Sequence, residues 1–134
     1  MIRYMLDTDI ASYILKKQHP KVETRMQALL PSAVCLSVVT HAELIYGLKQ
    51  LPPNHRLHYA IREFLKLVRI LPWDVEASSW YADIRHQLTT TGKLIGELDM
   101  MISAHAISKD AVLVTNNLRH YQRIKAPLML ESWV

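Results

Sequence analysis

Residues 2–10 read IRYMLDTDI, and this stretch decides the fold because an apolar run stops abruptly at a carboxylate. A run this short, from Ile2 to Leu6, predicts a buried β-strand. Asp7 then lies at the carboxyl end of that strand, which is where open parallel sheets bind their ligands. The next two residues, Thr8 and Asp9, are good helix caps and predict a helix up to Lys17.

The same alternation of strand and helix continues along the chain. Further strands are expected over Ala33–Val39, Ile70–Trp73 (with a turn), Ala111–Val114 and Leu128–Leu130. Helices are expected from Pro20 to near Pro31, from Thr40, over Asn54–Val68, from Asp74 to the break at Thr89–Gly92, and over Leu98–Ile107. Continuous apolar strands between helices indicate a parallel sheet covered on both faces. We therefore predict an α/β fold of three layers (α/β/α), with a central, mainly parallel sheet of four to five short strands.

The composition supports one compact domain over residues 1–134, with a formal net charge of +4 and 50% hydrophobic residues. Cys35 is the single cysteine, which excludes an intrachain disulfide and a zinc site built on cysteines. The sequence has no uncharged apolar stretch of about 18 residues, as a membrane span requires, and no signal-peptide pattern. We expect a cytoplasmic protein without a membrane partner. Its basic balance favours an acidic partner such as nucleic acid.

Three carboxylates, those of Asp7, Glu43 and Asp99, stand in otherwise apolar surroundings. Each has a simple structural explanation: Asp7 as a turn residue, Glu43 in a capping box with Thr40, and Asp99 at the positive end of a helix dipole. The dipole does not explain why Glu97 lies in the same turn as Asp99. Carboxylates that are brought together raise one another's pKa, and a divalent cation relieves this penalty. Oxygen ligands without His or Cys favour Mg²⁺ or Mn²⁺.

The sequence lacks the common motifs of several other kinds of functional site. It contains no dinucleotide-binding, phosphate-loop or HExxH motif. His55 and His58 are interpreted as part of a basic helix face that is solvated or faces a partner. His105 is interpreted as a core histidine with satisfied hydrogen bonds.

Five segments occur in order along the chain: MLDTDI at Asp7, LSVVTHAELIYG around Glu43, IGELDMMISAHAI around Asp99, VLVTNN at Thr115–Asn117, and RIKAPLMLESW. Together they resemble the PIN-domain ribonucleases, and among these the VapC toxins of bacterial toxin–antitoxin pairs, over essentially the whole length. The resemblance implies a PIN-like fold and a Mg²⁺- or Mn²⁺-dependent endoribonuclease that hydrolyses RNA phosphodiester bonds and so inhibits translation and growth, with tRNA a candidate substrate. It also implies a VapB-like antitoxin as partner and a homodimer.

Carried over by position, the resemblance makes Asp7, Glu43 and Asp99 the catalytic, metal-binding residues. Six more residues are candidates for supporting roles: Thr8, Asp9, Glu97, Thr115, Asn117 and His120. Asp9 stands where the family usually has Asn, and His120 where relatives commonly carry an acidic residue. The identity of the fourth ligand and the number of metal ions therefore stay open, with Asp9 or Glu97 as possible replacements.

Two alternatives remain at this point. A strand followed by Asp-x-Asp also opens the haloacid-dehalogenase-like phosphatases, in which Asp7 would be the nucleophile, but Ala11 stands where those enzymes have Thr or Val. The altered turn from Asn117 to His120 is compatible with a catalytically silent PIN-like module that binds only RNA or protein. The long helix over Asn54–Val68 and the helices near Ile10 and Val22 are candidate partner interfaces.

Overall fold

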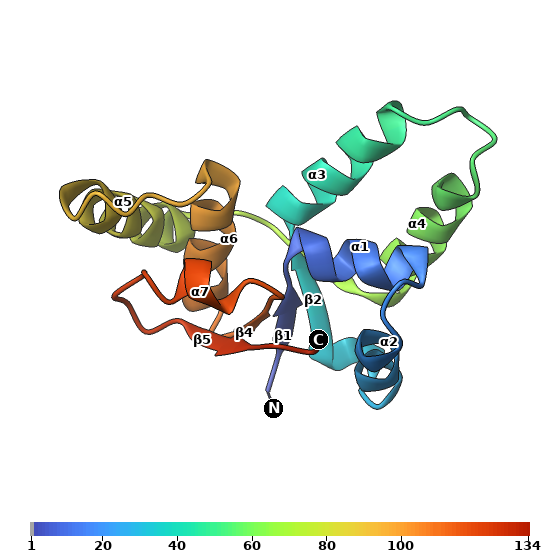
Figure 1. Cartoon of the computed structure of the whole chain (residues 1–134), viewed down its shortest axis with the longest axis horizontal. Coiled ribbons are helices and arrows are strands. Elements are labelled where there is room, and N and C mark those ends of the chain that lie inside the picture. Colours follow the sequence, from blue (N-terminus) through green and yellow to red (C-terminus); the bar gives the residue numbers. More distant parts are fainter. Residues whose placement is uncertain (1) are drawn as a thin grey trace.

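The computed structural model describes residues 2–134. Its elements follow in the order β1 (Tyr4–Leu6), α1 (Thr8–Lys16), α2 (Pro20–Gln27), a 3₁₀ turn (Pro31–Ala33), β2 (Val34–Ser37), α3 (Val38–Lys49), α4 (Arg56–Leu67), β3 (Arg69–Leu71), α5 (Val75–Thr90), α6 (Glu97–Ser108), β4 (Val112–Val114), α7 (Leu118–Tyr121) and β5 (Met129–Glu131). The sheet lies between α1–α4 on one side and α5 and α6 on the other (Figure 1).

The five strands form one sheet in the order β3-β2-β1-β4-β5, and every neighbouring pair is parallel. The chain builds outward from β1 to β3 and then resumes at β4 on the other side of β1. The topological switch point therefore lies between β1 and β4. In sheets of this kind, ligands bind beyond the carboxyl ends of the strands at that point. The predicted α/β architecture is confirmed.

Each face of the sheet carries its own hydrophobic core, because successive strand residues point to opposite faces. Met5 and Leu113 are fully buried in the core under α5 and α6. Their neighbours Leu6 and Val114 are fully buried in the core formed with α1–α4. The two cores confirm the predicted three layers. Helix α6 is buried almost throughout, as the apolar run up to Ile107 predicts.

The start of α3 differs from the prediction. It begins at Val38 and not at Thr40, because Ser37 Oγ accepts a hydrogen bond from the Val39 N–H at 3.0 Å and is the N-cap. Thr40 is fully buried inside the helix. The capping-box explanation of Glu43 is therefore wrong, and its carboxylate is free for another role.

Two further cap predictions are corrected. Helix α1 begins at Thr8 with Asp7 as its N-cap, so Thr8 and Asp9 are helical residues and not caps. The N-cap of α4 is His55 and not Asn54: His55 Nδ1 accepts the Leu57 N–H at 3.2 Å. The Nδ1 atom of His55 is therefore occupied by a hydrogen bond within α4. The short helix α7 was not predicted, because a four-residue helix is too short to produce a periodic pattern.

His105 is a core histidine, as predicted. It is fully buried on α6 and joins two strand ends: its Nδ1 lies 2.7 Å from Ser37 Oγ, and its Nε2 lies 3.0 Å from the Pro72 carbonyl oxygen. Ser37 Oγ already accepts from Val39, so its hydroxyl donates to Nδ1, and the Nε2–H donates to Pro72. Burial lowers the pKa of His105 and keeps the ring neutral.

Across residues 2–134, no helix combines the length and apolar character that crossing a bilayer requires.

Candidate active site

Four carboxylates converge on one pocket, about 170 Å³ in volume, at the carboxyl edge of the sheet. Asp7 directly follows β1, and Asp9 lies in the first turn of α1. Glu43 comes from α3, and Asp99 from the first turn of α6. The structure thus unites the three acidic residues predicted to be catalytic, together with Asp9, at the switch point of the sheet.

Asp7 is the most constrained of these carboxylates. Its side chain is 4% exposed, and Oδ1 accepts the Ile10 N–H at 2.9 Å, which makes Asp7 itself the N-cap of α1. Burial raises its pKa to about 6, the hydrogen bonds from Thr115 and Ile10 lower it, and the charges of Asp9 and Asp99 raise it again. The fold therefore holds Asp7 where its negative charge is poorly compensated.

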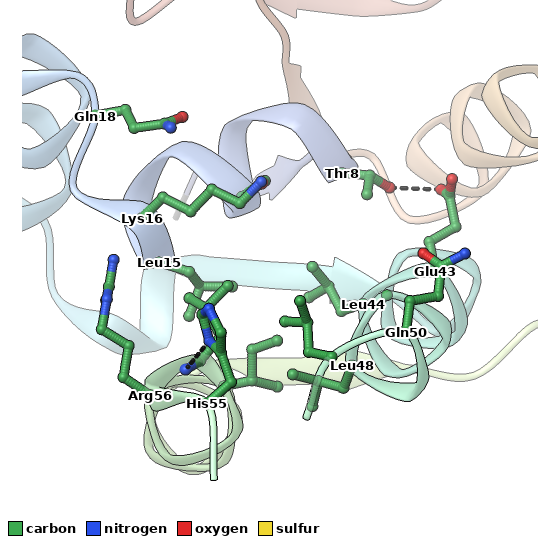
Figure 2. Close-up of a pocket in the computed structure, with 15 residues that line it drawn as sticks. Thr8, Leu15, Lys16, Gln18, Glu43, Leu44, Leu48, Gln50, His55 and Arg56 are labelled. Carbon is green, nitrogen blue, oxygen red and sulfur yellow. Dashed lines mark hydrogen bonds between the residues drawn. The ribbon is translucent and has the colours of Figure 1, made fainter. Parts of the chain in front are cut away.

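Glu43 has the same kind of environment at a half-buried position. The Thr8 hydroxyl donates to Glu43 Oε1 at 2.5 Å and fixes the carboxylate toward α1 (Figure 2). Burial raises the pKa of Glu43, the Thr8 hydrogen bond lowers it, and the charges of Asp99 and Asp9 raise it. Asp7 and Glu43 thus both experience the charge of Asp99, which is the mutual repulsion expected from the sequence.

The segment after β4 supplies neutral groups to this pocket. Thr115 is fully buried, and its Oγ1 accepts the Asn117 N–H at 3.0 Å while its side chain also bonds to Asp7. Asn117 and Tyr121 line the pocket, whereas Thr115 supports it from behind. Burial and the charges of Asp7 and Asp99 raise the pKa of Tyr121, so its hydroxyl stays protonated.

Tyr121 is a pocket residue that the sequence analysis missed. It is 2% exposed and lies four residues after Asn117, so the two side chains share one face of α7. That spacing was the available signal, but it indicates a shared face only once the segment is known to be helical.

Two more supporting candidates, besides Thr115, lie outside the pocket lining. Glu97 does not face the pocket: its Oε1 accepts from the Tyr81 hydroxyl at 3.0 Å and pairs with Arg85 Nη1 at 3.2 Å. His120 lies at the margin, with Nδ1 3.9 Å from Asp99 Oδ2. This nitrogen is buried and has no hydrogen-bond partner among residues 2–134.

The donor chemistry of the pocket suits a hard divalent cation. Its acidic ligands are all carboxylates, and no His or Cys lines it within the described chain. In residues 2–134, however, no group of three His, Cys, Asp or Glu side chains is placed so that it could hold an ion as it stands. Of the pocket carboxylates, Asp7 and Glu43 are held by hydrogen bonds, whereas the side chain of Asp99 is 39% exposed.

A larger groove, of about 660 Å³, adjoins the acidic pocket and runs between α1, α3 and α4 (Figure 2). Thr8 and Glu43 line both hollows. The groove has an apolar wall that includes Leu44 and Leu48, and Arg56 lies on its rim. It is long and amphipathic, unlike the small polar pocket.

The family profile of the PIN domain matches residues 4–126. The chain belongs to the PIN-domain family. It is 37% identical to Ribonuclease VapC2 of Haemophilus influenzae, and the match covers all of both chains. It is 34% identical to the tRNA(fMet)-specific endonuclease VapC of Shigella flexneri, over 99% of each chain.

Solved structures agree with this PIN-domain assignment. The fold matches VapBC2 of Rickettsia felis bound to a promoter DNA fragment with a TM-score of 0.90, and DNA-bound VapBC of Salmonella typhimurium with 0.91. Both are 31% identical and are covered over their whole length, as is this chain. The PIN domain is thus an endoribonuclease of the VapC toxin type. The phosphatase and the catalytically silent module find no support.

Proposed function

We propose that the acidic pocket is the catalytic centre of this toxin ribonuclease, with Asp7, Glu43 and Asp99 holding Mg²⁺ or Mn²⁺. The observation that carries the proposal is the buried Asp7, whose pKa is raised to about 6 beside other carboxylates at the switch point. A buried carboxylate whose charge the protein does not compensate is costly to the fold. A cation ligand role explains why such a group is retained.

Neighbouring residues orient two of the three carboxylates. The Ile10 N–H holds Asp7, and the Thr8 hydroxyl holds Glu43, so two ligands are oriented before substrate arrives. A divalent ion, when bound, orients water, lowers its pKa and neutralises charge on the phosphoryl oxygens. The Asn117 amide, which also lines the pocket, can donate a hydrogen bond to the RNA phosphate, and the protonated Tyr121 hydroxyl bonds to Asp99.

The RNA substrate we propose to test first is initiator tRNA. Support comes from the relatives of Shigella flexneri and Salmonella typhimurium, both named tRNA(fMet)-specific endonuclease, at 34% and 35% identity over nearly the whole chain. Total RNA is incubated with the toxin and Mg²⁺ or Mn²⁺, and the new RNA ends are sequenced. We expect one dominant cleavage in a tRNA and none with EDTA; undiminished cleavage in EDTA would overturn the metal-dependent centre.

The groove between α1, α3 and α4 is the site we propose for a VapB-like antitoxin segment. The groove is amphipathic and shares Thr8 and Glu43 with the catalytic pocket, so a segment bound there also obstructs the RNA. The matched structures of Rickettsia felis and Salmonella typhimurium are VapBC complexes bound to DNA. A homodimer, which the family resemblance implies, and a cytoplasmic location, which the composition favours, complete the proposal.

A further inference from the structure

A second pocket, about 260 Å³ in volume, has the opposite charge character. Four basic side chains line it, those of Lys93, Arg119, Arg123 and Lys125, and its other lining residues are Gln87, Thr91 and Gln122. No carboxylate from the described part of the chain contributes to its wall. The acidic pocket, in contrast, is lined by four carboxylates and no basic residue from the same part of the chain.

The wall of this basic pocket is fixed by hydrogen bonds between distant segments. The Gln87 side chain on α5 donates from Nε2 to the Arg123 carbonyl at 3.2 Å and accepts the Lys125 N–H on Oε1 at 3.0 Å. Arg123 Nη1 donates to the Leu94 carbonyl at 3.2 Å. The loop after α7 is therefore tied to α5 in a defined position, and the hollow is built into the fold.

The positive charges of this pocket are not balanced by carboxylates in the described part of the chain. Within residues 2–134, none of the four basic side chains forms an ion pair with a carboxylate, although Arg85 and Lys109 elsewhere on the molecule do. All four residues are exposed. Like charges gathered without counter-charges repel one another, so an anionic ligand would relieve the repulsion.

Helix α7 separates the two pockets. Asn117 and Tyr121 line the acidic side, whereas Arg119 and Gln122 line the basic side. A helix with its side chains is about 10 Å across. A strand of a few nucleotides spans that distance, so one RNA molecule can reach both pockets.

We propose that the basic pocket binds backbone phosphates of the RNA strand a few nucleotides from the bond that is cut. The inference rests on the proposed function, because it takes the acidic pocket as the point of cleavage. Phosphates are the anions that occur at regular spacing along the substrate, and Lys and Arg contacts to them are independent of base sequence. The basic pocket therefore fixes where the strand lies, while other contacts select the target.

The test uses the full chain with Arg119→Gln and Lys125→Gln combined, because neither side chain forms a hydrogen bond within residues 2–134. The matched control is Lys21→Gln with Arg62→Gln, two exposed residues on α2 and α4 that remove the same net charge. A fluorescent single-stranded RNA is titrated in EDTA over a range of salt concentrations. Thermal melts of both variants confirm folding.

We expect the pocket variant to bind RNA about tenfold more weakly, with the slope of log K against log salt reduced by about 1.4 for two lost phosphate contacts. Cleavage should show a raised KM with a nearly unchanged kcat. The control should keep the wild-type slope. Wild-type affinity and slope in the pocket variant would overturn the proposal.

The same measurements distinguish two other outcomes from phosphate binding at the basic pocket. If the pocket variant keeps RNA binding but loses its antitoxin, the pocket docks an acidic protein segment and the proposal is wrong. If the wild type binds RNA with the expected salt dependence but cleaves none, the proposed catalytic function fails while the phosphate site stands, because binding is read in EDTA.

Discussion

Replacing Asp7 by Asn should stabilise the metal-free protein while abolishing its activity. The Asn side chain keeps an oxygen that can accept the Ile10 N–H, so the cap of α1 is retained. What is removed is a buried charge. Folding raises the Asp7 pKa from 3.8 to about 6, which at 1.36 kcal/mol per unit corresponds to about 3 kcal/mol.

The pH dependence follows from the direction of this shift. The folded state binds the Asp7 proton more tightly than the unfolded state, so the favourable contribution is complete below pH 3.8 and is lost as the pH rises through about 6. At pH 7.5 in EDTA, Asp7→Asn should therefore raise the free energy of unfolding by up to about 3 kcal/mol. The melting temperature should rise by roughly 10 °C. At pH 3.5 the two proteins should melt alike.

Asp74 provides a matched control. It caps α5 in the same manner, with Oδ1 accepting the Ala77 N–H at 2.9 Å, but Lys109 Nζ lies 2.7 Å from its Oδ2. The hydrogen bond from Lys109 lowers the pKa of Asp74, so its charge contributes stability above pH 3.8 that is lost in acid. Asp74→Asn should therefore destabilise at pH 7.5. The reasoning is refuted if both variants destabilise the protein at pH 7.5 in EDTA.

Three further predictions concern catalysis, the core and the groove. Asp99→Asn should lower kcat by at least about 10²-fold, whereas Glu97→Gln in the same helical turn should leave RNA cleavage near the wild-type rate; equal losses would contradict the pocket assignment. His105→Leu should lower the free energy of unfolding by about 1–3 kcal/mol in urea melts at pH 7.5, because the buried Ser37 hydroxyl loses its acceptor and the Pro72 carbonyl loses its donor. Because burial lowers the His105 pKa, the wild type also loses stability below pH 6.5, and this part of the acid loss should be missing from the variant. A Cβ at Gly47 meets nothing within 4 Å, and Gly47 lines the groove, so the ring of Gly47→Phe should occupy the groove. This variant should keep RNA cleavage but lose the antitoxin in a pull-down, whereas Ala42→Phe, exposed on the same helix and outside the groove lining, should retain it.

The sequence predicted those parts of the fold that depend on long, simple patterns. Short apolar strands between helices require a covered parallel sheet, and this places Asp7 at its carboxyl edge. Asp99 lies in the first turn of a helix that is mostly buried, so it too lies near an element end. The grouping of Asp7 and Asp99 with Glu43 came from the resemblance to the PIN-domain ribonucleases, because the pattern around Glu43 alone favoured a capping box.

The remaining features depend on the direction of single side chains, which no periodic pattern encodes. Asp99 faces the pocket and Glu97 faces Arg85, because residues two apart on a helix point to different sides. Ser37, and not Thr40, is the N-cap of α3. The Ser37 hydroxyl accepts from the Val39 N–H and also bonds to His105, which lies 68 positions further along the chain. Such contacts are tertiary and become visible only in the fold.

The acidic and basic residues of the protein are distributed unevenly. Four of the twelve acidic residues line the acidic pocket, while Glu97 pairs with Arg85 outside it. The other eight stand against 16 Lys and Arg on the remainder of the molecule. The modest net charge of +4 thus combines an acidic pocket with a distinctly basic exterior, suited to holding a polyanion.

We propose that Asp7, Glu43 and Asp99 together hold the divalent ion on which RNA cleavage depends. A crystal of the wild-type protein soaked in Mn²⁺, measured for anomalous scattering, tests it most directly. We predict an anomalous peak within bonding distance of these three carboxylates and no such peak in an Asp7→Asn crystal. A peak elsewhere on the chain, or none in crystals of a preparation that cleaves RNA with Mn²⁺, would contradict the account.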